Sequence, residues 1–194
     1  MFRSFLMVPV FLIFLVSNSP AAETYVVDPA HSQIHFSVAH LMVFKVRGNF
    51  NEFSATVTVD PAQQTLTAAA ATIKTGSINT RNEKRDEHLR SADFFETGKF
   101  PEITFVSKKV SGSGDNIQVV GDLTIRGITR EVTLNGSFVG AATDPMGNSR
   151  AGFEATGQIN RKDFGLNWNK ALETGGFVVG DTVDIGLEIA AVQQ

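Results

Sequence analysis

The chain has 194 residues, a formal net charge of −3 at pH 7 and no cysteine. Without residues 1–22 it loses only Arg3 among its charged residues, and 16 basic stand against 20 acidic residues. This mildly acidic balance argues against nucleic acid or an anionic membrane surface as the main partner. The lack of cysteine excludes disulfides, thiol chemistry and iron–sulfur sites, so burial and hydrogen bonds must stabilise the fold.

The first 22 residues have the three-part pattern of a secretory signal peptide. Arg3 gives a positive start, residues 5–16 are almost entirely apolar, and Ser19 and Ala21 fit the small-residue positions before a cut. The apolar run has about 12 residues, too few for a membrane-spanning helix, which needs about 20. We therefore expect cleavage after Ala21 or Ala22, an exported protein without stable membrane insertion, and one domain over residues 23–194.

Apolar and polar residues alternate along most of the remaining chain. The alternation recurs in eight segments, at residues 33–38, 53–60, 65–74, 102–109, 117–126, 131–138, 153–160 and 182–189. Period-two alternation between turn-rich separators predicts half-buried strands, and one apolar face per strand predicts an antiparallel sheet with a single interior. Glycines inside strands, such as Gly121, predict tight bends.

Eight such strands must close on themselves or stack as two sheets. A membrane barrel would carry girdles of Trp and Tyr, but the chain has one of each. We therefore expect an all-β, eight-stranded antiparallel barrel with an apolar interior, wide enough to hold one slim ligand.

One segment, at about residues 80–90, breaks the alternation. Thr80 and Glu83 have the spacing of a capping box and predict a short helix, in which Asp86 and Arg90 are spaced for an ion pair. The helix is almost wholly polar. We expect Phe94 and Phe95 to anchor it across one end of the barrel.

Few residues have the spacing of a catalytic or metal centre. His31 and His35 lie four residues apart on a predicted strand, roughly 13 Å, which is too far for one ion. Asp28, His31 and Ser32 resemble a hydrolase triad in one row, but triad members normally come from separate segments, and the sequence has no G-x-S-x-G elbow. We assign no catalytic residue, no metal site and no cofactor.

The interior composition leaves a filled core and a ligand channel both open. The predicted inner faces carry phenylalanines at positions 36, 50, 53, 105, 138 and 153. Small residues at 68–71 stand against them, and bulky side chains facing small ones either interdigitate or leave a channel. Parity alone does not decide whether Ala69 or Ala70 points inward.

Several segments together resemble the YceI-like family of bacterial polyisoprenoid-binding, lipocalin-like proteins. They fall in family order at residues 25–32, 36–41, 46–50, 77–80, 85–95, 100–105, 121–129 and 161–165. One departure is Leu41-Met42-Val43-Phe44, where members often have glycine after the leucine.

The resemblance implies an up-and-down barrel with a helical crossover, a long apolar tunnel, a periplasmic location and a homodimer. It implies a bound polyprenyl chain or isoprenoid quinone and supplies no catalytic residues. We expect the following residues to contact the ligand: Phe36, Val38, His40, Phe50, Ala70, Arg85, Asp86, His88, Phe94, Phe105, Phe153 and Phe164. Our main hypothesis is a carrier of a long lipophile, with Arg85 facing its headgroup. The alternatives are an enzyme acting on a lipid at the barrel mouth and an interaction module with a filled core.

Overall fold

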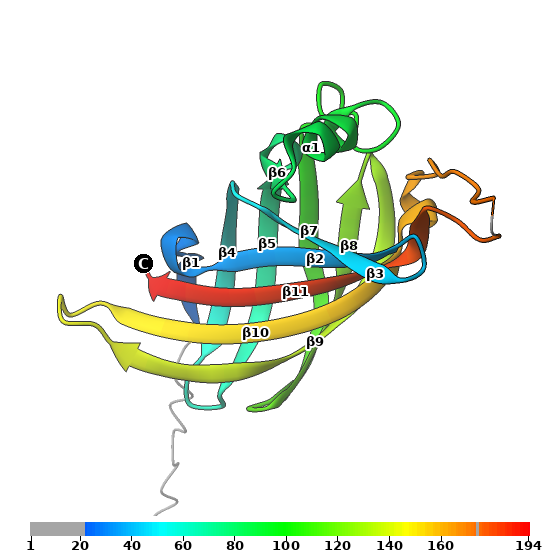
Figure 1. The fold of residues 1–194 in the computed structure, drawn as a ribbon. Coiled ribbons are helices and arrows are strands. Elements are labelled where there is room, and N and C mark those ends of the chain that lie inside the picture. The colour runs from blue at the N-terminus through cyan, green and yellow to red at the C-terminus, as the bar shows by residue number, and fades with distance from the viewer. Residues whose placement is uncertain (1–21, 174) are drawn as a thin grey trace, which may run out of the picture.

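The computed structural model describes residues 22–173 and 175–194, so the predicted signal peptide lies outside the described residues except for Ala22. Eleven strand segments and one α-helix are present in this part of the chain (Figure 1). The strands are β1 (Glu23–Val27), β2 (Gln33–His40), β3 (Phe44–Phe50), β4 (Phe53–Asp60), β5 (Thr65–Lys74), β6 (Ile78–Asn79), β7 (Glu102–Ser113), β8 (Asn116–Ile125), β9 (Ile128–Thr143), β10 (Ser149–Asn160) and β11 (Val179–Gln193). The helix α1 covers Glu83–Arg90.

The eleven segments form eight long strands, because the first three strands are each broken once. β1 continues into β2, β3 into β4, and β5 into β6, and each half pairs with the matching half of its neighbour. β11 closes the ring by pairing with both β1 and β2. All pairings are antiparallel, and all except the closing one join long strands that follow one another along the chain, so the predicted eight-stranded up-and-down barrel is confirmed. The alternation had marked only one half of each broken strand and missed β1, β3 and β6.

Local hydrogen bonds account for the breaks. Between β1 and β2, Pro29 cannot donate to a ladder, and the Asp28 carboxylate accepts the Ala30 amide at 3.0 Å. The other two breaks are bonded to each other, since the Asn51 amide donates to the Ser77 carbonyl and the Glu52 amide donates to the Ser77 hydroxyl. Corners of this kind let long strands curve around one interior.

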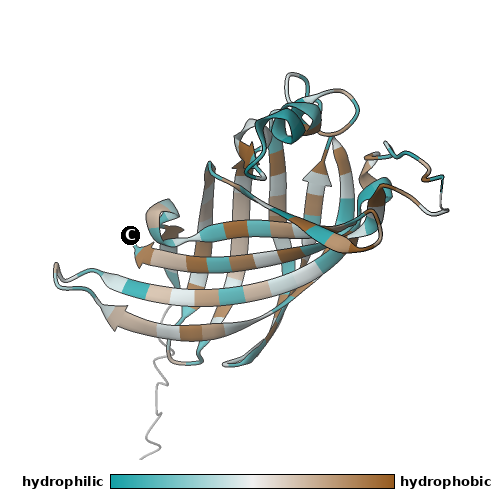
Figure 2. Cartoon of the chain, viewed as in Figure 1, coloured by the Kyte–Doolittle hydropathy of each residue, from teal (hydrophilic) through white to brown (hydrophobic). Residues whose placement is uncertain are grey.

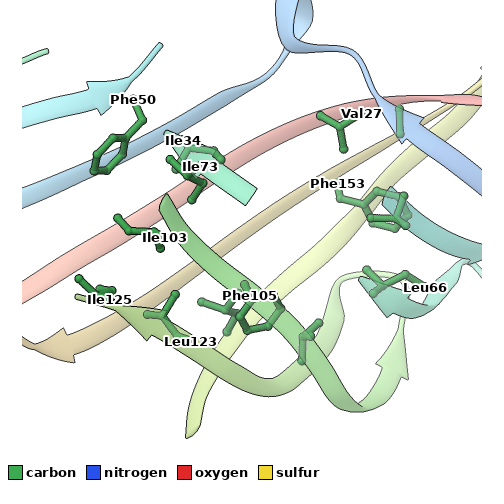
Figure 3. Packing of buried hydrophobic residues seen from close by; sticks show 14 of the residues in the cluster. Val27, Ile34, Phe50, Leu66, Ile73, Ile103, Phe105, Leu123, Ile125 and Phe153 are labelled. Atoms are coloured by element: carbon green, nitrogen blue, oxygen red, sulfur yellow. The ribbon is translucent and has the colours of Figure 1, made fainter. Parts of the chain in front are cut away.

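The apolar side chains face that interior. In Figure 2, hydrophobic and hydrophilic residues alternate along the strands, and Figure 3 shows Ile34, Phe50, Ile103 and Phe105 among the clustered residues. The buried cluster draws residues from all the long strands. Each phenylalanine expected on an inner face belongs to this cluster or packs against it.

The crossover between β6 and β7 carries α1, which Figure 1 shows over one end of the barrel. Asn82 caps the helix by accepting the Arg85 amide, so the predicted capping box with Thr80 as the cap is wrong. The predicted ion pair of Asp86 with Arg90 is also absent from this helix. Arg90 pairs instead with Glu83 at 3.2 Å, and the Asp86 carboxylate turns back toward Thr80.

Phe94 is buried and Phe95 is partly buried against the core, which confirms that this pair anchors the crossover. Within the two described ranges, no helix has the length and apolarity needed to cross a membrane.

Gly121 on β8 gives room to an aromatic ring, next to an irregularity in the pairing of β7 with β8. A Cβ at this position would lie 2.5 Å from Cζ of Phe105 and 2.6 Å from the Val106 carbonyl oxygen. Gly121→Ala should therefore displace the Phe105 ring or the neighbouring strand and lower the free energy of unfolding by about 1–3 kcal/mol. Chemical denaturation measures the change. Gly76→Ala is the control because a Cβ there meets nothing within 4 Å. Equal stabilities of the two variants would contradict this packing.

Candidate ligand-binding site

The barrel encloses a cavity of about 340 Å³. Every strand except β6 contributes to its wall, together with α1 and the segment between β10 and β11. This volume lies within the range of small-molecule pockets, about 300–1,000 Å³. The core of the barrel is therefore not solid. The sequence was compatible with a filled core or with a ligand channel, and the structure contains open space.

Nine of the twelve residues expected to contact a ligand lie on the cavity wall. They are Phe36, Val38, His40, Phe50, Ala70, Arg85, His88, Phe94 and Phe105. Strand parity explains most of them, because Phe36, Val38 and His40 follow one another on the inner face of β2. Whether they bind a ligand stays a prediction.

The other three residues do not lie on the wall. The Asp86 carboxylate is buried and accepts hydrogen bonds from Thr80. Phe153 is buried against Phe138, with ring centroids 5.3 Å apart in an edge-on arrangement. Phe164 is almost fully buried in the 3₁₀ turn Arg161–Phe164 and fills the core. Two of these side chains therefore belong to the packed part of the core, and the third holds Thr80.

The alanine run on β5 now has a defined inner face. Ala69 and Ala71 pack against the core, whereas Ala68 and Ala70 are exposed, although Ala70 still borders the cavity. Ala71 stands opposite Ala55 of β4 and Phe105 of β7. Small residues on two adjacent strands therefore leave open space in front of the phenylalanine ring.

A polar group lies at the α1 end of this apolar wall. Arg85 donates from Nε to the Thr80 hydroxyl at 2.7 Å and from Nη2 to the Thr80 carbonyl at 2.8 Å. The Thr80 hydroxyl and amide in turn donate to one carboxylate oxygen of Asp86, at 2.5 and 2.9 Å. Thr80 and Asp86 are both buried, so Asp86 fixes Thr80 and Thr80 fixes the guanidinium on the wall.

His40 is the second polar group on the wall. Its Nδ1 atom is buried and has no hydrogen-bond partner among the described residues. Burial lowers the pKa of His40, and the positive charge of Arg85 lowers it further, because both disfavour the imidazolium. A neutral imidazole next to an arginine provides a hydrogen-bonding position inside an apolar space.

His88 marks the place where the cavity reaches the surface. It lines the wall, yet its side chain is 39% exposed. Its Nε2 lies 2.9 Å from a carboxylate oxygen of Asp93, and its ring packs edge-on against Phe94 and Trp168. The cavity mouth therefore lies between α1 and the segment that carries Trp168.

Arg161 is a wall residue that the sequence did not single out. It is buried, and its guanidinium donates to the carbonyls of Gly180 and Trp168 and approaches Asp181 at 3.3 Å. Burial lowers its pKa. Because backbone carbonyls take up its donors, Arg161 holds the segment after β10 onto the barrel. Among the described residues, the wall carries arginines and histidines but no carboxylate.

The residues that resembled a triad do not form one. His31 bonds Asp28 at 2.8 Å, but the Ser32 hydroxyl donates to the Ala190 carbonyl and accepts from the Ala190 amide. Within the described part of the chain, no three His, Asp or Glu residues come together as a metal site would require.

This geometry agrees with comparisons to known proteins. The family model for the YceI-like domain matches residues 25–191. The chain belongs to the YceI-like family. A UPF0312 protein from Staphylococcus aureus strain MSSA476 is 50% identical over 157 residues, covering 80% of this chain and 90% of that protein.

Solved YceI-like structures share the barrel. The YceI protein of Campylobacter jejuni has a TM-score of 0.71 at 32% identity, covering 80% of this chain and 90% of that one. BcnA of Burkholderia cenocepacia has a TM-score of 0.73 at 25% identity, with 84% and 98% covered. A polyisoprenoid-binding domain from Saccharophagus degradans has the same fold at a TM-score of 0.66 and 16% identity, with 90% and 100% covered.

The effect of the Arg85 charge on His40 gives a prediction for titration. The pKa of His40 should lie below its ordinary value and should rise in Arg85→Gln, because that change removes the nearby positive charge. Histidine NMR signals followed against pH measure it. Arg47→Gln, which removes an exposed charge from β3, is the control and should leave His40 almost unchanged. An equal His40 pKa in the parent and in Arg85→Gln would contradict an electrostatic effect of Arg85 on His40.

Proposed function

We propose that this protein holds one long lipophilic molecule, such as a polyprenyl chain or an isoprenoid quinone, as a periplasmic carrier or buffer. The observation that carries the proposal is the apolar cavity enclosed by the barrel strands. The fold is shared with a structure described as a polyisoprenoid-binding domain, which supports a lipid-binding role. The signal-peptide pattern of residues 1–22 supports export.

Burial of apolar surface provides the affinity. Each Å² of apolar surface removed from water contributes about 25 cal/mol, so a chain several isoprene units long gains several kcal/mol without any polar contact. The phenylalanine, valine and isoleucine side chains of the wall offer such surface over most of its area. The apolar part of the wall therefore selects for the length and width of the ligand tail.

The polar groups near the mouth set the direction in which a ligand enters. Arg85 and His40 border the cavity close to α1, and His88 lies where the cavity meets solvent. An amphiphile gains most when its tail fills the apolar interior and its oxygen atoms meet these donors. A quinone carbonyl or a pyrophosphate satisfies this condition.

A lipid-modifying enzyme is the second candidate, and one contact favours it. His88 and Asp93 form a hydrogen-bonded pair at the mouth, which resembles a general base and the group that orients it. Under this alternative, His88→Ala abolishes turnover of the bound lipid while leaving it bound.

Extraction of the purified protein with organic solvent tests the carrier function. We expect mass spectrometry to find one class of long apolar molecule at a constant ratio to protein. Ala71→Phe places a ring in the cavity and should lower that ratio severalfold. Ala68→Phe is the matched control, since Ala68 is exposed on the opposite face of β5 and does not border the cavity.

The controls make the outcome decisive. Both variants must keep the melting temperature within a few degrees of the parent. Repeated absence of any extractable lipid, or equal lipid content in folded Ala71→Phe and Ala68→Phe, would contradict a ligand in this cavity.

The headgroup role of Arg85 is tested with two ligands of equal length. Arg85→Ala should weaken binding of an isoprenoid with a pyrophosphate or quinone end by about 1–3 kcal/mol, the scale of a hydrogen bond to a charged group. Binding of a bare hydrocarbon should remain nearly unchanged. Isothermal titration or competition with a fluorescent lipid measures both. Equal losses for the two ligands, together with a lower melting temperature, would make Arg85 structural through its bonds to Thr80.

A further inference from the structure

A group of exposed apolar side chains lies beside the cavity mouth. Met42 and Val43 lie in the turn between β2 and β3, Phe44 begins β3, and Phe177 precedes β11. All four are at least half exposed, with Met42 at 71% and Val43 at 80%. We call these four residues the apolar rim. Large side chains exposed together, rather than singly, indicate an interaction surface.

The rim is one surface although it comes from two loops. The Leu41 amide donates to the Val178 carbonyl at 2.8 Å, which joins the β2–β3 turn to the segment before β11. Met42 also lies against Gly176, where an added Cβ would be 2.1 Å from the methionine sulfur. Figure 1 shows both loops projecting at the same end of the barrel, opposite the turn between β9 and β10.

The rim is continuous with the cavity. His40 and Val178, which directly adjoin the two loops, both line the wall. The ring of Phe44 packs against His40 with centroids 5.2 Å apart, so an exposed rim residue touches a wall residue. The rim therefore adjoins the wall of the cavity directly.

We infer that the apolar rim docks on the surface of a lipid bilayer, with its side chains entering the interfacial region and the cavity mouth facing the membrane. The inference of docking follows from the exposed apolar side chains and does not depend on the proposed function. Its use for loading or unloading a lipophile rests on the proposed function, since a long apolar molecule does not cross water freely.

The size of the rim favours a bilayer over a second copy of the chain. A stable protein interface buries about 800 Å² and about 20–30 residues on each side. Four side chains at two loop tips fall far below that, but they suit shallow insertion among headgroups, where each buried apolar side chain adds to binding.

The charges beside the rim point to a zwitterionic surface. Lys45 pairs with Asp184 at 2.5 Å. Lys170 and Glu173, of opposite sign, are both exposed on the neighbouring loop. Since no excess of positive charge accompanies the apolar side chains here, the attraction is hydrophobic and should change little with salt.

Sedimentation with phosphatidylcholine vesicles tests the inference. The parent protein should partition onto the vesicles at both low and high salt. The double variant Met42→Asn with Val43→Ser should partition about tenfold less, because it removes the two most exposed apolar side chains of the rim. Asparagine at position 42 tolerates the positive φ of 61° found there.

The opposite end of the barrel offers a matched control. Val139 and Met146, at 63% and 81% exposure, lie on β9 and in the β9–β10 turn. The double variant Val139→Ser with Met146→Asn removes the same two side-chain types and should partition like the parent. Thermal melts confirm that both double variants fold, and Phe177→Ser replaces the rim variant if it does not.

Trp168 reports the orientation, because it is the only tryptophan and lies at the cavity mouth. Vesicles with brominated acyl chains should quench its fluorescence in the parent and in the control variant, but not in the rim variant. Equal partitioning of the rim and control variants, or no partitioning of the parent, would overturn the inference. A concentration-dependent dimer that the rim variant loses, without vesicle binding, would assign the surface to a second copy instead.

A separate measurement distinguishes this inference from the proposed function. Lipid supplied in dilute ethanol, without vesicles, should load both the parent and the rim variant, as seen by native mass spectrometry. If neither protein holds lipid while the parent still binds vesicles through the rim, the carrier function fails and membrane docking stands.

Discussion

The closed ring of eight strands is the constraint on which the other features depend. Each strand must bury one apolar face, and closure leaves a single interior for all of them. The width of that interior is set by strand number, not by the side chains available to fill it. Ala55 and Ala71 lie side by side on adjacent strands, and their small side chains do not fill the interior in front of them. The unfilled space is part of the cavity.

The crossover between β6 and β7 holds a polar helix over an apolar interior. Only Leu89 of α1 packs against the core, so the helix has little hydrophobic surface of its own with which to hold its position. The buried hydrogen bonds that Thr80 donates to the Asp86 carboxylate hold the helix in place of such a surface, and Phe94 adds an apolar anchor after the helix. One consequence is a charged guanidinium held on the wall of a lipid-sized space.

Alternation of residues was enough to predict the barrel, because it records directly which face each strand buries. It missed β1, β3 and β6, where a break interrupts each pattern after a few residues. The phenylalanines of the wall followed from the same parity. Ala69 and Ala71 did not, since four consecutive alanines carry no alternation, and only pairing with β4 and β7 settles their direction.

The polar residues were harder to place from sequence, for a physical reason. The direction of the Asp86 carboxylate depends on Thr80, which lies before the helix and was expected to cap it. Arg161 lies in a 3₁₀ turn, where an arginine usually meets solvent, and only the fold brings the carbonyls of Gly180 and Trp168 around it. Such networks are made by tertiary contacts and leave no periodic signal.

The cavity wall has a one-sided charge that bears on which amphiphiles it admits. Arg85 and Arg161 border it, and among the described residues no carboxylate does. In an interior of low polarity, repulsion between like charges is felt over longer distances than in water. A cationic headgroup placed beside these arginines would therefore meet repulsion that a neutral or anionic headgroup on a tail of equal length would not.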